Sequence, residues 1–266
     1  MFLKNRRIFI TALLSVLLVS CSKYQKILKS SDHEMKFQKA NEYFEREDYY
    51  RALNLYEQLL PVYRATEKAE TIYYNYAYAY YNQRDYVLAS YYFKRFVKTF
   101  PRSEKAEECF YMSAYCKYLE SPVYSLDQTN TFEAIDELQL FINSYPDSER
   151  VEKCNDLIDE LREKLQKKQF EIARLYLKMD HYTAAVAAFE NLMEEYPSTK
   201  YREEALYYII RANYLYAQKS VSQKKEERYL EAIEAYDNFK AVYPDSRFNR
   251  DAFSMYESSL KETNIN

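Results

Sequence analysis

Sulfur and imidazole side chains are the groups in this sequence most able to do chemistry, and they are few. The 266 residues contain four Cys and two His. Cys109 and Cys116 are seven positions apart, which on one helix separates them by about 10 Å along the axis, beyond the reach of a disulfide. The C-x2-C spacing typical of zinc sites is missing. We therefore interpret Cys109, Cys116 and Cys154 as small buried side chains.

The two histidines form no catalytic constellation. His181 stands in "KMDHY", which aligns with the turn sequences "QRDY" and "REDY" earlier in the chain, and His33 has no partner in view. The many Glu and Lys residues follow the solvent faces of helices, so no acid and base pair stands out. We expect neither an enzyme nor a cofactor or metal site.

The fourth cysteine, Cys21, stands at the end of an N-terminal export signal. The basic stretch "KNRR" precedes the apolar run "IFITALLSVLLV" at residues 8–19. That run is shorter than the roughly 20 residues that span a bilayer and fits a secretory signal. It ends in "LVSC", which resembles a bacterial lipobox, whereas the site of a simple signal peptide fits poorly. We expect residues 1–20 to be removed and Cys21 to carry the lipid that anchors the chain to a membrane.

Composition and charge favour an all-α fold. The chain has no Gly and no Trp, but it has 32 Tyr and 15 Phe. Tight hairpins and phosphate loops depend on Gly for positive φ, so its absence predicts helices joined by short turns. The formal charge is −3, and removal of the first 20 residues, with three basic residues and no acid, makes it −6. This balance argues against a nucleic-acid partner.

A proline marks the end of a pattern that recurs along the chain. Four copies end at Pro101, Pro146, Pro197 and Pro244, and an aromatic residue precedes each of them. A hydroxyl residue follows each proline two positions later, and we expect it to be the N-cap of the next helix. These residues are Ser103, Ser148, Thr199 and Ser246.

Small residues occupy three equivalent positions in each copy. Eight positions after the proline come Cys109, Cys154, Ala205 and Ala252; twelve before it come Ala89, Ala134, Ala185 and Ala232; further upstream come Ala77, Ala114, Ala173 and Ala212. A large residue stands eight before the proline, as Phe93, Leu138, Phe189 or Tyr236. This order resembles a tetratricopeptide repeat, in which small residues let two antiparallel helices, A and B, pack closely. A fifth copy, at the start, lacks its proline and contains Ala40, Tyr43, Ala52 and Tyr56.

Two irregularities interrupt the repeat. Copies three and five carry eight-residue insertions between their helices, inside "LESPVYSLDQTNTF" and "AQKSVSQKKEERYL". Between copies three and four, the stretch 149–180 contains no Pro and repeats Leu at i+4 spacing, with charges on the opposite face. We interpret it as helix B of copy three, extended into helix A of copy four and up to about 45 Å long.

The predicted architecture is therefore a right-handed superhelix of about five tetratricopeptide-like helix pairs, with a long helix that links repeats three and four. The predicted domains are a signal peptide (1–20), a lipidated tether (21–34), the N-terminal repeats one to three (35–148), the connecting helix (149–180) and the C-terminal repeats four and five (173–262).

Tyrosine is the residue whose pattern indicates a binding surface. In helix A of such a repeat, side chains just after the small position and three before it face the concave groove. In copies two and three these positions, with the one three residues further on, hold Tyr74, Tyr78, Tyr81, Tyr111, Tyr115 and Tyr118. Tyr couples an apolar ring to a hydroxyl, which suits capture of an extended or helical peptide with aromatic side chains. Any single one of them could serve the core between helices, whereas the six together favour a peptide-binding groove.

A lipobox followed by five such repeats resembles the BamD family, the lipoproteins of the outer-membrane β-barrel assembly machinery. The resemblance extends over nearly everything after Cys21. It is strongest in "ALNLYEQLLPVYRATEKAETIYYNYAYAYYNQRDYVLASYYFKRFVKTFP" and "LREKLQKKQFEIARLYLKMDHYTAAVAAFENLMEEYPSTKYREEALYYIIRANYLYA". The missing proline of copy one, the abundance of Tyr and the long insertion in copy five depart from the family pattern.

The resemblance implies a periplasmic adaptor, held at the inner leaflet of the outer membrane by acylated Cys21. Its N-terminal repeats would receive unfolded outer-membrane protein precursors through their aromatic-ended C-terminal segment. Its C-terminal repeats would dock the periplasmic domains of the β-barrel insertase. A coordinator of envelope division or a secretin pilot would share the repeats but lack the long helix. A glycan-binding lipoprotein would be longer and rich in Trp and Gly.

The lipobox gives the first testable prediction. Cys21→Ser removes the thiol that is acylated, so we expect an uncleaved or soluble form instead of a processed lipoprotein. Metabolic labelling with a fatty acid, together with membrane fractionation, measures both effects. Normal processing and wild-type lipid labelling of Cys21→Ser would contradict the lipobox.

Overall fold

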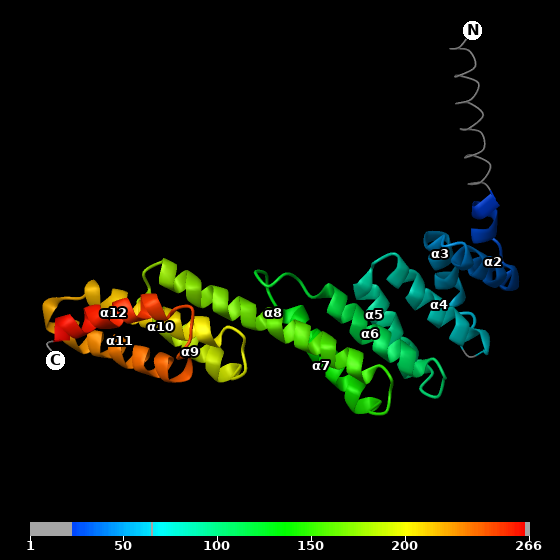
Figure 1. Cartoon of the computed structure of the whole chain (residues 1–266). Helices are drawn as coiled ribbons and strands as arrows, with labels where there is room; N and C mark the ends of the chain where they lie inside the picture. Colours follow the sequence, from blue (N-terminus) through cyan, green and yellow to red (C-terminus); the bar gives the residue numbers. More distant parts are fainter. Residues whose placement is uncertain (1–22, 65, 264–266) are drawn as a thin grey trace, which may run out of the picture. The chain divides into compact units, whose positions relative to one another are not determined.

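The computed structural model describes residues 23–64 and 66–263, and all regular structure in these ranges is helical, as predicted (Figure 1). The chain forms two compact units. Unit 1 contains residues up to Pro122 together with Thr129–Ile158, and unit 2 contains Val123–Gln128 together with the residues from Asp159 onward. Within the described ranges no helix is both long and apolar enough to cross a bilayer.

Unit 1 holds the first three helix pairs. They are α2 (His33–Glu45) with α3 (Tyr49–Leu59), α4 (Lys68–Asn82) with α5 (Tyr86–Thr99), and α6 (Ala106–Glu120) with α7 (Thr129–Ser144). Each helix packs against the next one in the chain, which is the arrangement expected of repeats one to three.

Unit 2 holds the remaining helices. The part of α8 (Val151–Lys178) from Asp159 onward is followed by α9 (Tyr182–Glu195), α10 (Arg202–Gln218), α11 (Ser222–Val242) and a final helix, α12 (Asn249–Thr263). Helices α9, α10 and α11 pack in sequence, and α12 packs on α11 and α10.

The long helix is confirmed, but its origin differs from the prediction. It has 28 residues, about 42 Å at 1.5 Å per residue. Helix α7 ends at Ser144 and Pro146 separates it from α8, because a proline cannot continue the preceding helix. The long helix is thus helix A of copy four with extra turns at its N-terminal end, and not an extension of helix B of copy three.

The small positions of the repeat are all buried. Each of the twelve Ala and Cys residues named above is at most 1% exposed, and the large residues Phe93, Leu138 and Phe189 are fully buried. Cys109, Cys116 and Cys154 are free, as predicted. Burial raises the pKa of Cys116 to about 12 and that of Cys154 to about 11, so the thiols stay protonated and unreactive.

The N-terminal segment and the insertion in copy five are helical, whereas the insertion in copy three is not. Residues 23–28, placed in the tether above, are helical, and Tyr24 packs edge-on against Tyr43 at 5.8 Å between ring centroids. The insertion in copy five lengthens α11 at its N-terminal end. In copy three, Val123–Gln128 lies against α8, where Lys167 Nζ is 4.4 Å from the Tyr124 ring centroid and Lys168 donates to the Leu126 carbonyl.

The residues after the prolines do not cap their helices as predicted. The N-cap residues of α6 and α10 are Lys105 and Tyr201, two positions beyond Ser103 and Thr199. Ser103 Oγ instead accepts from the Lys105 amide at 3.1 Å, within a turn before the helix. The hydroxyl also donates to Glu70 of the preceding A helix at 2.9 Å, so it connects neighbouring repeats.

The turns inside copies one, two and four need positive φ, although the chain has no Gly. Glu47, Arg84 and Asp180 have φ of 61°, 62° and 63°. The amide after each of them donates to a carbonyl five residues back, at 2.9 Å for Asp48 and 3.0 Å for Asp85 and His181. These bonds close each helix as in a Schellman motif and allow the next helix to begin at once.

His181 is a turn residue, as predicted. It is the N-cap residue of α9, but its side chain accepts no hydrogen bond from the first turn of that helix. Asp48 and Asp85, at the same position in copies one and two, accept hydrogen bonds from the amides of Arg51 at 3.4 Å and Leu88 at 3.1 Å. His181 makes no side-chain cap bond at the start of α9.

We expect His181→Asp to stabilise the chain by about 1 kcal/mol, because a carboxylate at the N-cap accepts an otherwise unpaired amide. His181→Asn should give a similar gain without adding a charge beside Asp180, and His181→Ala should give none. Denaturant unfolding of the three variants measures the difference. Unchanged unfolding free energy in both the Asp and Asn variants would show that the turn cannot accept a side-chain cap.

Candidate functional site

The six tyrosines predicted to line a groove form two ladders of rings on the A helices of copies two and three. On α4, the ring centroids of Tyr74 and Tyr78 are 4.7 Å apart and those of Tyr78 and Tyr81 are 6.2 Å apart. On α6, Tyr111, Tyr115 and Tyr118 stack at 5.8 Å between successive rings, with interplanar angles of 11° and 14°. All six side chains are half-buried. We call this surface the tyrosine strip.

The strip rests on the core of unit 1. Tyr78 lies edge-on to Phe93 at 4.9 Å, and Tyr111 lies edge-on to Phe141 at 5.8 Å. Desolvation by this packing raises the pKa of Tyr74 to about 12 and also raises the pKa of Tyr78. The rings therefore contribute to the core and keep part of their surface accessible, while their role in a peptide-binding groove stays a prediction.

A carboxylate that the sequence pattern did not predict joins the two ladders. Glu108, on α6, accepts a hydrogen bond from the Tyr74 hydroxyl at 3.1 Å, and the Tyr78 hydroxyl donates to the same Oε1 atom. The available signal was an acid three positions before Tyr111 on an otherwise aromatic helix face. Because both hydroxyls come from α4, Glu108 holds the two ladders together as one surface.

Cations border the strip. Lys105 Nζ lies 4.5 Å from the ring centroid of Tyr74, and the Arg150 guanidinium carbon lies 5.5 Å from that of Tyr111. The combination of rings, one carboxylate and bordering cations suits the binding of apolar and aromatic side chains. Among the residues that the structure describes there is no group of three metal-ligating side chains. Cys21 lies outside the described residues.

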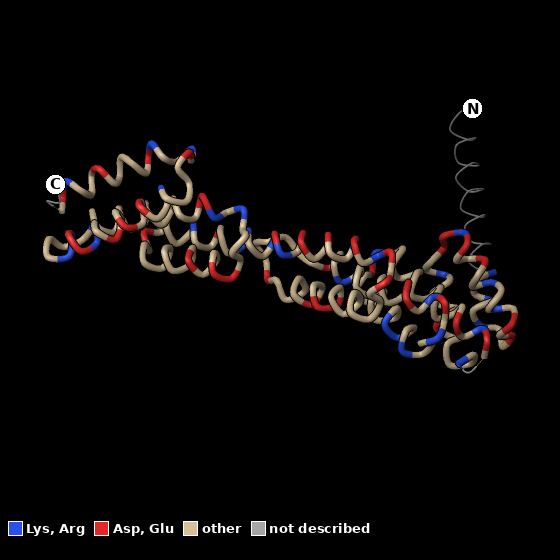
Figure 2. Tube along the Cα trace, turned by 60° about the horizontal axis from the view of Figure 1, so that its bottom comes forward, with Lys and Arg blue, Asp and Glu red and all other residues tan. Residues whose placement is uncertain are grey.

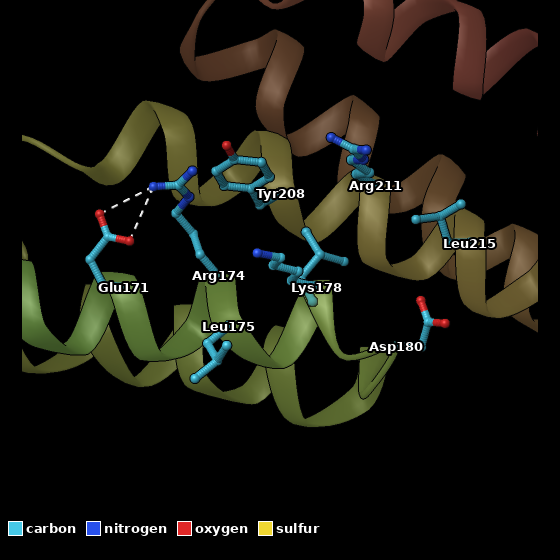
Figure 3. Close-up of a pocket in the computed structure, with 9 residues that line it drawn as sticks. Glu171, Arg174, Leu175, Lys178, Asp180, Tyr208, Arg211 and Leu215 are labelled. Atoms are coloured by element: carbon cyan, nitrogen blue, oxygen red, sulfur yellow. Dashed lines mark hydrogen bonds and ion pairs between the residues drawn. The ribbon is translucent and has the colours of Figure 1, made fainter.

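A pocket of about 690 Å³ lies in unit 2, between α8 and α10 (Figure 3). Its apolar surface includes Leu175, Leu215 and the ring of Tyr208, and its cations are Arg174, Lys178 and Arg211. We call it the cationic pocket. A smaller hollow of about 350 Å³ between α10 and α12 shares Arg211 and Leu215 with it.

The two acids of the cationic pocket are already paired. Both oxygens of Glu171 lie 3.1 Å from Arg174 Nη1 (Figure 3), and Asp180 pairs with Lys219 at 2.8 Å. Within residues 23–64 and 66–263, Lys178 and Arg211 take part in no ion pair. The pocket therefore offers two uncompensated positive charges beside an apolar surface. Along the traced chain, segments of Lys and Arg alternate with segments of Asp and Glu (Figure 2).

These features define a class of protein before any comparison. Successive paired helices that pack each on the next are typical of a helical-repeat protein. A family model described as "YfiO: Outer membrane lipoprotein" matches residues 29–229. The chain belongs to this family of outer membrane lipoproteins.

Two curated relatives match a shorter stretch. Over 84 residues the chain is 31% identical to "Outer membrane protein assembly factor BamD" of Rickettsia prowazekii, covering 32% of this chain and 34% of that protein. Over 86 residues it is 30% identical to the protein of the same name from Caulobacter vibrioides, covering 32% of this chain and 28% of the relative. The matches thus span about a third of each relative.

Solved structures with the same type of repeat are more distant. The TPR2AB domain of yeast Sti1, solved as a pHSP90 complex, is 15% identical with a TM-score of 0.40, covering 86% of this chain and 98% of that one. A TPR repeats protein of Bacteroides fragilis is 14% identical with a TM-score of 0.38, covering 87% and 99%.

Proposed function

We propose that this protein is a lipid-anchored periplasmic scaffold for the assembly of outer-membrane β-barrel proteins. Unit 1 binds unfolded barrel precursors on the tyrosine strip, unit 2 docks the periplasmic domains of the insertase, and Cys21 carries the lipid. Membership of the outer membrane lipoprotein family and the names of the two relatives support this role. The observation that carries it is the continuous surface of six half-buried tyrosines.

The spacing of the rings fits an extended peptide. Side chains on one face of a strand repeat about every 6.6 Å, at 3.3 Å per residue. The rings of Tyr111, Tyr115 and Tyr118 repeat every 5.8 Å, which is close to that distance. A precursor segment with aromatic residues at alternate positions can therefore place successive rings against successive tyrosines, while Glu108 fixes the orientation of the α4 rings.

The cationic pocket is the docking surface that unit 2 offers. Lys178 and Arg211 favour an acidic partner surface, and Leu175, Leu215 and Tyr208 offer apolar area beside them. Electrostatic complementarity of this kind orients partners and excludes surfaces of the wrong charge. We assign the insertase contact to this pocket on the basis of that chemistry.

The tyrosine strip is tested with a peptide. Tyr78→Ala and Tyr115→Ala should each weaken the binding of a labelled C-terminal barrel peptide by about 1 to 3 kcal/mol, as loss of an aromatic anchor does. Fluorescence anisotropy measures the affinity, and melting curves run in parallel report the fold.

Tyr236→Ala is the matched control for this experiment. Tyr236 is only 7% exposed and stacks on Tyr256 in unit 2, so its loss should lower stability without a selective effect on the peptide. Equal peptide affinity in wild type and in both strip variants, with the fold intact, would move the receptor site elsewhere.

The docking surface is tested by charge reversal. Arg211→Glu should weaken binding of the insertase's periplasmic domains more than about tenfold, because like charges would then meet. Arg250→Glu, exposed on α12 and outside both hollows, is the matched control. Surface plasmon resonance with the full-length variants measures the effect. An equal loss of affinity in the two variants would show that only general electrostatic attraction is involved. Unchanged affinity in Arg211→Glu would show that the cationic pocket is not part of the interface.

A further inference from the structure

A separate cavity lies in unit 1 along α5, outside the tyrosine strip. It has a volume of about 710 Å³. Most of its lining comes from α5, and Tyr73 of α4, Phe110 of α6 and Arg64 complete it. We call it the basic cavity. Neither the binding of precursors nor the docking of a partner proposed above uses it.

Cations dominate the rim of the basic cavity. Arg64, Lys94, Arg95 and Lys98 line it, and no acid does. Lys94 pairs with Glu137, and the Arg95 guanidinium carbon lies 5.5 Å from the Tyr73 ring centroid, whereas Arg64 and Lys98 form no ion pair among the described residues. The segment 94–105 has five basic residues and one acid, a net charge of +4 in a chain of −3.

Aromatic and aliphatic side chains form the rest of the cavity. Tyr73 is buried, whereas Tyr91 is 56% exposed. Val87, one turn before Tyr91 on the same face of α5, is 61% exposed. The outer face of α5 is therefore apolar in its first half and basic in its second half.

We propose that this face binds the anionic headgroup region of a phospholipid. Exposed apolar residues beside Lys and Arg are the combination by which proteins associate with anionic membrane surfaces. A hollow of 710 Å³ is in the range that holds a ligand of drug size, much larger than a free phosphate ion. The phosphate contacts Arg64, Arg95 and Lys98, and the glycerol and upper acyl segments contact Tyr73, Tyr91 and Phe110.

The experiment must exclude the signal peptide and the acyl anchor. We therefore use the chain from residue 23 onward, which retains every described residue, and measure its co-sedimentation with vesicles. The vesicles consist of phosphatidylcholine, with or without phosphatidylglycerol. We expect binding only to the vesicles that contain phosphatidylglycerol. Because each basic residue contributes about fivefold to such binding, Arg64→Ala combined with Lys98→Ala should weaken it about 25-fold.

The matched control removes one Lys and one Arg elsewhere. Lys153→Ala combined with Arg250→Ala changes two exposed residues outside the basic cavity, lowers the net charge by the same amount and should bind almost as wild type does. Tyr91→Ser, which leaves the charge unchanged, should also weaken vesicle binding. Tyr91→Ser therefore distinguishes a site that binds an amphiphile from general attraction of the vesicles by positive charge.

Three results would overturn the proposal. The first is equal vesicle binding by wild type and by the Arg64→Ala, Lys98→Ala variant. The second is full displacement of the vesicles by an equal concentration of free glycerol phosphate, which would indicate a site for a simple anion. The third is tighter binding of a polyglutamate peptide than of vesicles, which would make the occupant an acidic protein segment. None of these measurements involves the barrel peptide, so their outcome is independent of the proposed function.

Discussion

The close approach of helices at small side chains is the interaction on which the rest of this structure depends. Twelve Ala and Cys residues at three repeating positions are at most 1% exposed, so each is enclosed by its own and the neighbouring helices. A larger side chain there would force the helices apart, at a typical cost of about 1 to 3 kcal/mol. The positions of the bulky residues follow from this constraint, because rings can be placed only beside the crossings.

The abundance of Tyr follows in part from those flanking positions. A ring beside a crossing reaches from the core to its rim, where a hydroxyl can find a polar partner and a Phe would expose an apolar edge. Tyr56 is fully buried, yet its hydroxyl donates to Asn41 at 2.7 Å and accepts from Asn75 at 3.0 Å, which links copies one and two. The tyrosine strip extends this use of Tyr, with Glu108 in the place of the amides. The same residue type thus forms part of the core and of the tyrosine strip.

The sequence predicts the buried small positions and the long helix, but it misplaces the N-caps and one helix boundary. The small positions could be found because a close crossing tolerates few residue types, so the same constraint leaves the same mark in each copy. The boundary between α7 and α8 was misplaced, although Pro146 marks it, because the leucine spacing of the following stretch does not show where the helix begins. Ser103 was misassigned because its hydroxyl can accept within either a turn or a helix start, and only the Glu70 contact distinguishes them. Lys178 and Arg211 are 33 positions apart, and nothing in the pattern pairs them.

The position of a residue within its helix pair determines the surface to which it can contribute. The tyrosine strip lies on α4 and α6, and the cationic pocket lies on α8 and α10; all four are A helices of their copies. The basic cavity lies mainly on α5, a B helix. Helices of both kinds pack on their neighbours in the chain, so each leaves only part of its surface free. On α5 the free face combines exposed Val87 and Tyr91 with Lys98. Because separate helix faces carry the surfaces, substitutions on one of them can alter its ligand without disturbing the small-residue crossings that hold the repeats together.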